Sequence, residues 1–304
     1  MPRLDPNELF ELNPDRPELG RPVLVQALDG FIDAGSARRL AREHLMSAYG
    51  SQVVATFDVD QLLDYRARRP TMMFVEDHWD SYEDPVLAIH LLHDAEGTPF
   101  LLLSGPEPDV QWERFTEAVR ILIDRLGVRL TVGLNAIPMG VPHTRPVGVI
   151  AHGSRKALVE GYEPWINAVQ VPGTAGHLLE YRLGKAGYDA VGFAVHVPHY
   201  VSQAEYPAAS VSLVTELGKA GGLSLSLTEL ETAADATRQA IDEQVAASED
   251  VAGVVSALEH QYDSYVTGRG EPTLISDESA LPTADELGAE LERYLAERTQ
   301  DPPI

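Results

Sequence analysis

The 304-residue sequence contains no cysteine, which excludes disulfides, thiolate metal sites, iron–sulfur clusters and a cysteine nucleophile. It also has no apolar run close to the roughly 20 residues that a membrane-spanning helix needs. The first 20 residues are acidic and rich in proline, unlike a secretory signal peptide. The sequence therefore predicts a cytoplasmic protein with no membrane partner.

Positive charge is also scarce, because 23 Lys and Arg residues stand against 47 Asp and Glu residues and give a formal net charge of −24. A field of this sign repels a phosphate backbone, which makes nucleic acid and anionic membrane surfaces poor partners. The apolar share of 44% and the charged share of 23% are close to those of ordinary globular proteins. We therefore expect one large folded domain with an appendage.

The chain divides into three regions by composition. Residues 1–20 contain four prolines and are predicted as an irregular N-terminal arm. Residues 21–222 alternate apolar runs with helical periodicity. Residues 223–304 are predicted as an acidic helical extension, because 18 acidic and 4 basic residues follow from Leu227 onward. Within it, we expect one or two amphipathic helices, a linker over 268–282 and a last helix over 283–298.

The middle region reads as alternating strands and helices. Short apolar runs at 22–28 and 52–59 predict strands, and the runs at 86–94 and 98–105 flank a turn that suits a hairpin. Helical spacing predicts helices that end at Gly50 and Gly127, with further strand and helix units up to residue 222. This pattern predicts an α/β fold, a three-layer α/β/α sandwich with a mostly parallel mixed sheet. Residues 60–85 show no clear period.

Three loops contain residues that could bind a ligand. The first follows the strand at 22–28 and opens a helix, the place where ligands bind in open α/β sheets. Its candidates are Asp29, Asp33, Gly35 and Ser36; the alternative is a tight strand-to-helix turn in which Asp33 or Ser36 is an ordinary helix cap. The loop matches neither a dinucleotide-binding fingerprint nor a P-loop.

The second loop supplies His143, Arg145 and His152. Arginine offers a planar fork for an anionic group and histidine a proton acceptor near neutral pH, so these residues could grip an anion. Arg145 could instead pair with the abundant surface carboxylates, an arrangement that contributes about 0–1 kcal/mol.

The third loop supplies Gly173, Thr174 and His177 at the start of a predicted helix, where free N–H groups could meet a ligand or Thr174 could simply cap the helix. The pair His196 and His199 is a poor metal site, because Pro198 prevents their alignment on a helix. No Gly-x-Ser-x-Gly elbow is present. We therefore predict no catalytic residue, no metal and no cofactor.

Several stretches together resemble the proteasome assembly chaperone 2 family. They are the segment Asp29 to Gly35, LLLSGPEPDVQW at 101–112, PMGVPHTRP at 138–146 and the stretch 172–200. The resemblance covers about residues 20–222 and is similar to the longer bacterial members, which carry a helical C-terminal extension. It implies a phosphorylase/hydrolase-like sandwich and no established active site. Eukaryotic relatives help to assemble the 20S proteasome and dock through a hydrophobic-tyrosine-x tail, from which residues 301–304 depart.

Two functions follow as hypotheses. The first is a non-catalytic interaction or assembly module that forms a homo-oligomer and acts on proteasome subunits. The alternative is a phosphorylase/hydrolase-like enzyme, or a sensor, for a small anionic or nucleoside-like ligand. In that alternative, Arg145 would clamp the anion, His143 or His152 would act as general base, and the N–H groups near Gly35 and Gly173 would form an anion nest.

Overall fold

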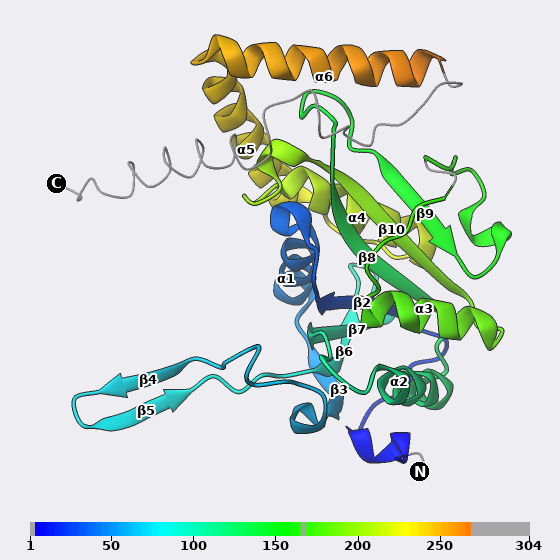
Figure 1. The fold of residues 1–304 in the computed structure, drawn as a ribbon. Helices are drawn as coiled ribbons and strands as arrows, with labels where there is room; N and C mark the ends of the chain where they lie inside the picture. Colours follow the sequence, from blue (N-terminus) through cyan, green and yellow to red (C-terminus); the bar gives the residue numbers. More distant parts are fainter. Residues whose placement is uncertain (1–3, 166–167, 269–304) are drawn as a thin grey trace.

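A computed structural model describes residues 4–165 and 168–268 of the chain. Within them, eight strands form one mixed sheet in the order β1-β3-β6-β7-β2-β8-β10-β9 (Figure 1). The four strands β7, β2, β8 and β10 are mutually parallel. The strands on either side of this group pair antiparallel with their neighbours.

The sheet strands are β1 (Phe10–Leu12), β2 (Val23–Asp29), β3 (Gln52–Phe57), β6 (Ala88–His93), β7 (Pro99–Pro106), β8 (Leu130–Met139), β9 (Val149–Gly153) and β10 (Ala190–Pro198). The helices are α1 (Ala37–Tyr49), α2 (Trp112–Leu126), α3 (Ala175–Lys185), α4 (Pro207–Gly221), α5 (Thr228–Ala246) and α6 (Glu249–Gly268). A separate hairpin joins β4 (Met72–Val75) to β5 (His78–Tyr82).

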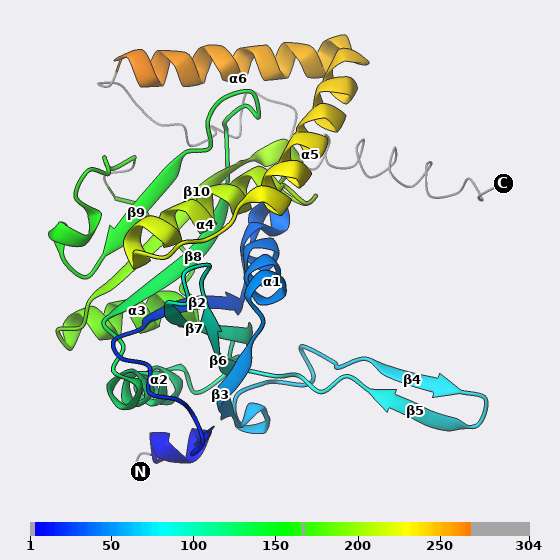
Figure 2. The same ribbon diagram turned by 180° about the vertical axis from the view of Figure 1, so that it is seen from behind.

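Helices cover both faces of the sheet and create two cores (Figures 1 and 2). Strand β2 shows the division, since Val23 and Val25 face the core of α1, α4 and α5, whereas Leu24 and Leu28 face the core of α2 and α3. Side chains alternate along a strand, so an almost uniformly apolar strand can fill two cores at once. The predicted three-layer α/β/α sandwich is confirmed.

Local signals fix most of the element ends. Helix α1 stops at Gly50, and α2 stops at Gly127, whose left-handed φ of +66° lets its N–H bond back to the last turn. The predicted hairpin is strands β6 and β7, paired in antiparallel register from Ala88↔Ser104 to His93↔Pro99.

The N-terminal arm differs from its prediction as wholly irregular. Residues Phe10–Leu12 form the edge strand β1 and pair antiparallel with β3, with Phe10 opposite Phe57. Leu9 and Phe10 are buried in the core of α2 and α3. The prolines on either side confine β1 to three residues at the sheet edge, a position where missing N–H donors do little harm.

The segment 60–85, which has no clear period in the sequence, contains the β4–β5 hairpin. The hairpin projects away from the body of the molecule (Figures 1 and 2). Every residue of its two strands is exposed, including Phe74 and Trp79, whose rings contact each other at 5.1 Å between centroids.

The described part of the C-terminal region forms two helices. Leu230 and Ile241 of α5 are buried in the core of α1 and α4, while α6 runs across the end of the molecule near β9 and β10 (Figure 1). The helix predicted over 283–298 lies outside the described residues. None of the described helices has the length and apolar character needed to cross a membrane.

The close contact of Gly105 gives a test of the packing. Gly105 has φ +125°, and an added Cβ would lie 2.1 Å from the carbonyl oxygen of Val86. We expect Gly105→Ala to lower the free energy of unfolding by about 3 kcal/mol, because the backbone must move. Gly97→Ala is the control, since Gly97 has φ +82° with no atom within 4 Å of the new Cβ. It should cost about 1 kcal/mol. Equal losses in urea denaturation would contradict this packing.

Candidate functional site

The carboxyl ends of the parallel strands lie along one rim of the sheet. At this rim, the connections from two neighbouring strands lead to opposite faces of the sheet. After β2 the chain turns into α1 on one face, whereas after the adjacent strand β7 it turns into α2 on the other. In open α/β sheets, such a switch point leaves a crevice in which ligands bind. We therefore expect a functional site at the rim beyond β2 and β7.

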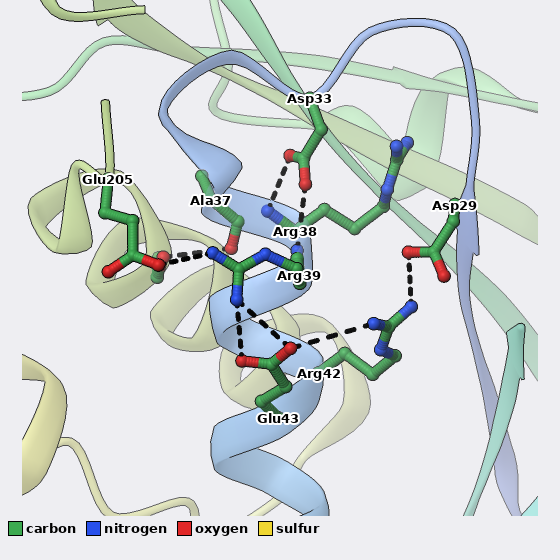
Figure 3. A network of polar contacts seen from close by, with 9 residues as sticks. Asp29, Asp33, Ala37, Arg38, Arg39, Arg42, Glu43 and Glu205 are labelled. Carbon is green, nitrogen blue, oxygen red and sulfur yellow. Dashed lines mark hydrogen bonds and ion pairs between the residues drawn. The ribbon is translucent and has the colours of Figure 1, made fainter. Parts of the chain in front are cut away.

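The first predicted loop, from Asp29 to Ser36, lies on this rim, and its polar groups serve the start of α1 (Figure 3). The Asp33 carboxylate accepts the backbone N–H groups of Arg38 at 2.8 Å and Arg39 at 3.0 Å. Asp33 therefore caps α1, whereas the side chain of Ser36 makes no capping bond. Asp29 is paired with Arg42.

Gly35 does not provide the predicted anion nest. Its N–H donates to the carbonyl oxygen of Ser202 at 2.7 Å, and its own carbonyl accepts from Tyr206. An added Cβ would lie 2.7 Å from the Cβ of Tyr206, so glycine is required for this close approach. The loop is fastened to the segment before α4, and the Gly35 N–H has no capacity left for a ligand.

The third predicted loop also reaches the rim, at the start of α3. Thr174 caps the helix by accepting the N–H of His177 at 3.0 Å. The Glu107 carboxylate, which follows β7, accepts the N–H of Ala175 at 2.5 Å. The His177 ring lies 3.4 Å from the amide of Asn135 on β8, and burial lowers the pKa of His177.

Beside this helix start lies a pocket of about 560 Å³ between α3 and β9. His152, Gly173 and His177, predicted from two different loops, all line it. His152 Nδ1 lies 2.8 Å from a carboxylate oxygen of Glu180, and the two histidine rings are 6.2 Å apart. An added Cβ on Gly192 of β10 would lie 2.2 Å from the His152 ring. The His152–Glu180 pair is therefore held against the sheet by packing.

His143 and Arg145 are engaged elsewhere, which removes the predicted anion clamp. Arg145 forms a two-point ion pair with Asp263 of α6, at 2.8 and 2.7 Å, and this hydrogen bonding raises the pKa of Arg145. The buried His143 ring bridges the Tyr200 hydroxyl at 2.7 Å and Asp242 of α5 at 3.0 Å. Both residues tie the second loop to the C-terminal helices, so neither is free to serve as clamp or base.

Three buried polar side chains at the rim were not predicted. Gln26 is 8% exposed, Arg38 7% and Glu107 5%. Gln26 interrupts an otherwise apolar strand, a signal that the sequence did contain. Arg38 looks the same in sequence as its neighbours Arg39 and Arg42, and only the tertiary structure distinguishes the buried one. No group of three or more His, Asp or Glu side chains in the described chain is arranged to hold a metal ion.

A second buried cluster lies where α6 passes β10. His196 is 1% exposed, neither ring nitrogen has a hydrogen-bond partner, and the Trp165 ring contacts it edge-on at 4.5 Å. Trp165 in turn stacks on Tyr265 of α6. Burial lowers the pKa of His196 from 6.5 to about 4, because an imidazolium there would lose its hydration.

The low pKa of His196 predicts a dependence of stability on pH. Between pH 6.5 and about 4 the unfolded chain binds a proton at this residue and the folded chain does not. This contribution to stability is complete above pH 6.5 and is lost as the pH falls, to the extent of about 3 kcal/mol. In His196→Leu, the free energy of unfolding should therefore fall less between these pH values. Replacing the exposed His78 by Leu is the control, and equal slopes for all three proteins would contradict the assignment.

Comparison with known proteins places this geometry in a family. The model of the PAC2 family matches residues 27–245. The crystal structure of Rv2714 from Mycobacterium tuberculosis, a protein of unknown function, is 51% identical with a TM-score of 0.81, and the match covers 86% of this chain and 92% of that one. A Corynebacterium glutamicum protein of unknown function is 39% identical with a TM-score of 0.82, covering 87% and 100%.

A third structure, Rv2125 from Mycobacterium tuberculosis, is described as a proteasome-assembly chaperone homologue. It is 27% identical with a TM-score of 0.71, and the match covers 77% of this chain and 99% of that one. No curated protein matches the sequence. The resemblance seen in the sequence is confirmed by the family match, and the chain belongs to the PAC2 family.

Proposed function

We propose that this protein is a non-catalytic interaction module that works as a homo-oligomer in the cytoplasm and assists the assembly of proteasome subunits. Membership of the PAC2 family supports the assembly role, and so does the similarity to a proteasome-assembly chaperone homologue. The observation that carries the proposal is the projecting β4–β5 hairpin, which exposes apolar side chains of the kind found at protein–protein interfaces.

The hairpin concentrates exposed apolar surface in one segment. Seven of the fifteen large apolar side chains that are exposed in the described residues lie between positions 72 and 86. An isolated two-stranded ribbon is marginally stable in water, and clustered apolar side chains mark an interaction site. The hairpin therefore needs a surface against which to pack.

A second copy of the chain is the partner that fits this hairpin. Both faces of the hairpin are exposed along its whole length, so it requires a partner that is present whenever the chain is folded. Closed symmetric self-association supplies such a partner, because every copy contributes one ribbon and one receiving surface.

The self-association can be tested with two substitutions on the ribbon. Phe74 and Trp79 are the most exposed aromatic pair of the hairpin, at 54% and 64%. The double variant Phe74→Asp and Trp79→Asp should lower the molar mass measured by light scattering to that of one 33.2 kDa chain, while the wild type forms an oligomer.

Val110→Asp is the matched control, since Val110 is an exposed apolar residue outside the hairpin. It should leave the oligomer intact. A wild-type protein that is monomeric at micromolar concentration would refute self-association through the hairpin, and so would a double variant with unchanged mass.

The assembly role makes a separate prediction. Full-length tagged protein isolated from its own cells should retain proteasome α-type subunits. The same isolation from cells that contain only the untagged protein is the control, and it should recover far less of these subunits. Recovery of the bait alone, from cells that contain a proteasome, would count against assembly as the function. That result would leave the oligomer measurement unaffected, so the two parts of the proposal are judged independently.

A further inference from the structure

The buried polar side chains at the rim form a site that the interaction role does not use. Arg38, Glu107 and Gln26 are each more than nine-tenths buried. Glu107 and Gln26 contact the first turn of α3, and Arg38 lies in the first turn of α1. Glu107 accepts the N–H of Ala175, and an added Cβ on Gly176 would lie 2.7 Å from the Gln26 amide nitrogen. The charge of Arg38 acts on His177.

Arg38 carries a buried charge without a carboxylate partner. Its Nη2 donates to the carbonyl oxygen of Ile32 at 3.1 Å, and its buried Nε has no partner. No ion pair in the described chain includes it, although Asp33, Asp29 and Glu107 lie near enough to favour its charge. Burial outweighs these three carboxylates and lowers the pKa of Arg38.

Two of these three carboxylates are engaged by other groups. Asp33 holds backbone N–H groups of α1, and Asp29 is paired with Arg42 (Figure 3). In the same view the guanidinium of Arg38 extends away from the atoms that Asp33 binds. A buried guanidinium normally has a paired anion, because an uncompensated charge in the interior is costly.

Glu107 carries the opposite charge at the same rim, near enough to favour the charge of Arg38. Its Oε1 accepts the Ala175 N–H, and its Oε2 lies against Gly30, where an added Cβ would come within 2.8 Å. No cation of the described residues forms an ion pair with Glu107, and no hydrogen bond of those residues engages the Gln26 amide. The rim thus holds a buried cation, a buried anion and an amide with unused hydrogen-bonding capacity.

We propose that this part of the rim binds a small zwitterion of the amino-acid type, with its carboxylate on Arg38, its ammonium on Glu107 and the Gln26 amide as a further contact. A ligand with a single charge would leave one of the two buried groups uncompensated, whereas a zwitterion compensates both. The planar fork of arginine matches a carboxylate in two-point geometry. The place fits as well, because it is the switch point between β2 and β7.

The test uses full-length protein and a panel of defined probes in thermal unfolding. The probes are the standard amino acids, with acetate, methylamine, inorganic phosphate and a set of nucleosides for comparison. At ten times its Kd, at least one amino acid should raise Tm by about 2 °C. Acetate, methylamine and phosphate should each give a clearly smaller rise, because each satisfies only one of the two charges.

Variants then assign the effect to residues. Arg38→Met and Glu107→Gln should each weaken binding of that amino acid at least tenfold in calorimetric titration. Arg39→Met is the matched control on the same helix, since Arg39 pairs with Glu43 and Glu205 at the surface and should bind as the wild type does. Without ligand, Arg38→Met should melt no lower than the wild type, because the substitution removes an unpaired buried charge.

Several results would overturn the proposal. Silence across all amino acids would do so, as would a phosphate or nucleoside effect that equals or exceeds theirs. Binding that survives both substitutions would place the ligand elsewhere. A markedly lower Tm of ligand-free Arg38→Met would show that Arg38 is a structural partner of Glu107. None of these results bears on the oligomer, whose contact residues lie on the hairpin.

Discussion

Burial of both faces of strand β2 is the constraint on which the rest of this structure depends. Its apolar side chains must be covered above and below, so α1 and α2, which follow neighbouring strands, lie on opposite faces. The chain therefore separates at the ends of β2 and β7, which is the position where open α/β sheets bind ligands. In this central strand, Gln26 is the residue whose polarity conflicts with its burial, and it lies beneath the start of α3.

Local chemistry made much of this fold predictable. Alternating apolar runs, the Asp33 and Thr174 caps and the glycines after α1 and α2 act over a few residues, so the sequence displays them directly. Strand β1 was not predicted, because its three residues lie among prolines and become a strand only by pairing with β3. The β4–β5 hairpin was not predicted, because its exposed strands lack the alternation of apolar and polar residues that a buried face imposes.

The site was harder to predict than the fold, for a physical reason. Which arginine is buried depends on the direction of α1 over the rim, and which carboxylate faces it depends on β7, some 70 residues later in the chain. Arg145, by contrast, has the residue type expected of an anion clamp, yet α6 supplies its carboxylates. Sequence shows which groups can pair, and tertiary structure decides which of them do. The hairpin and the buried rim residues belong to different parts of the chain, so the two proposed roles can be separated by mutation.

The two cores also differ in when a growing chain can complete them. The core beneath α2 and α3 draws its buried side chains from residues between Leu9 and Ala190, whereas the core beneath α1 and α4 includes Leu230 and Ile241 of α5. During synthesis, the first layer has all its components some fifty residues before the second. Until α5 leaves the ribosome, the layer containing α1 keeps part of its apolar surface in water. The order of emergence therefore protects one side of the sheet before the other.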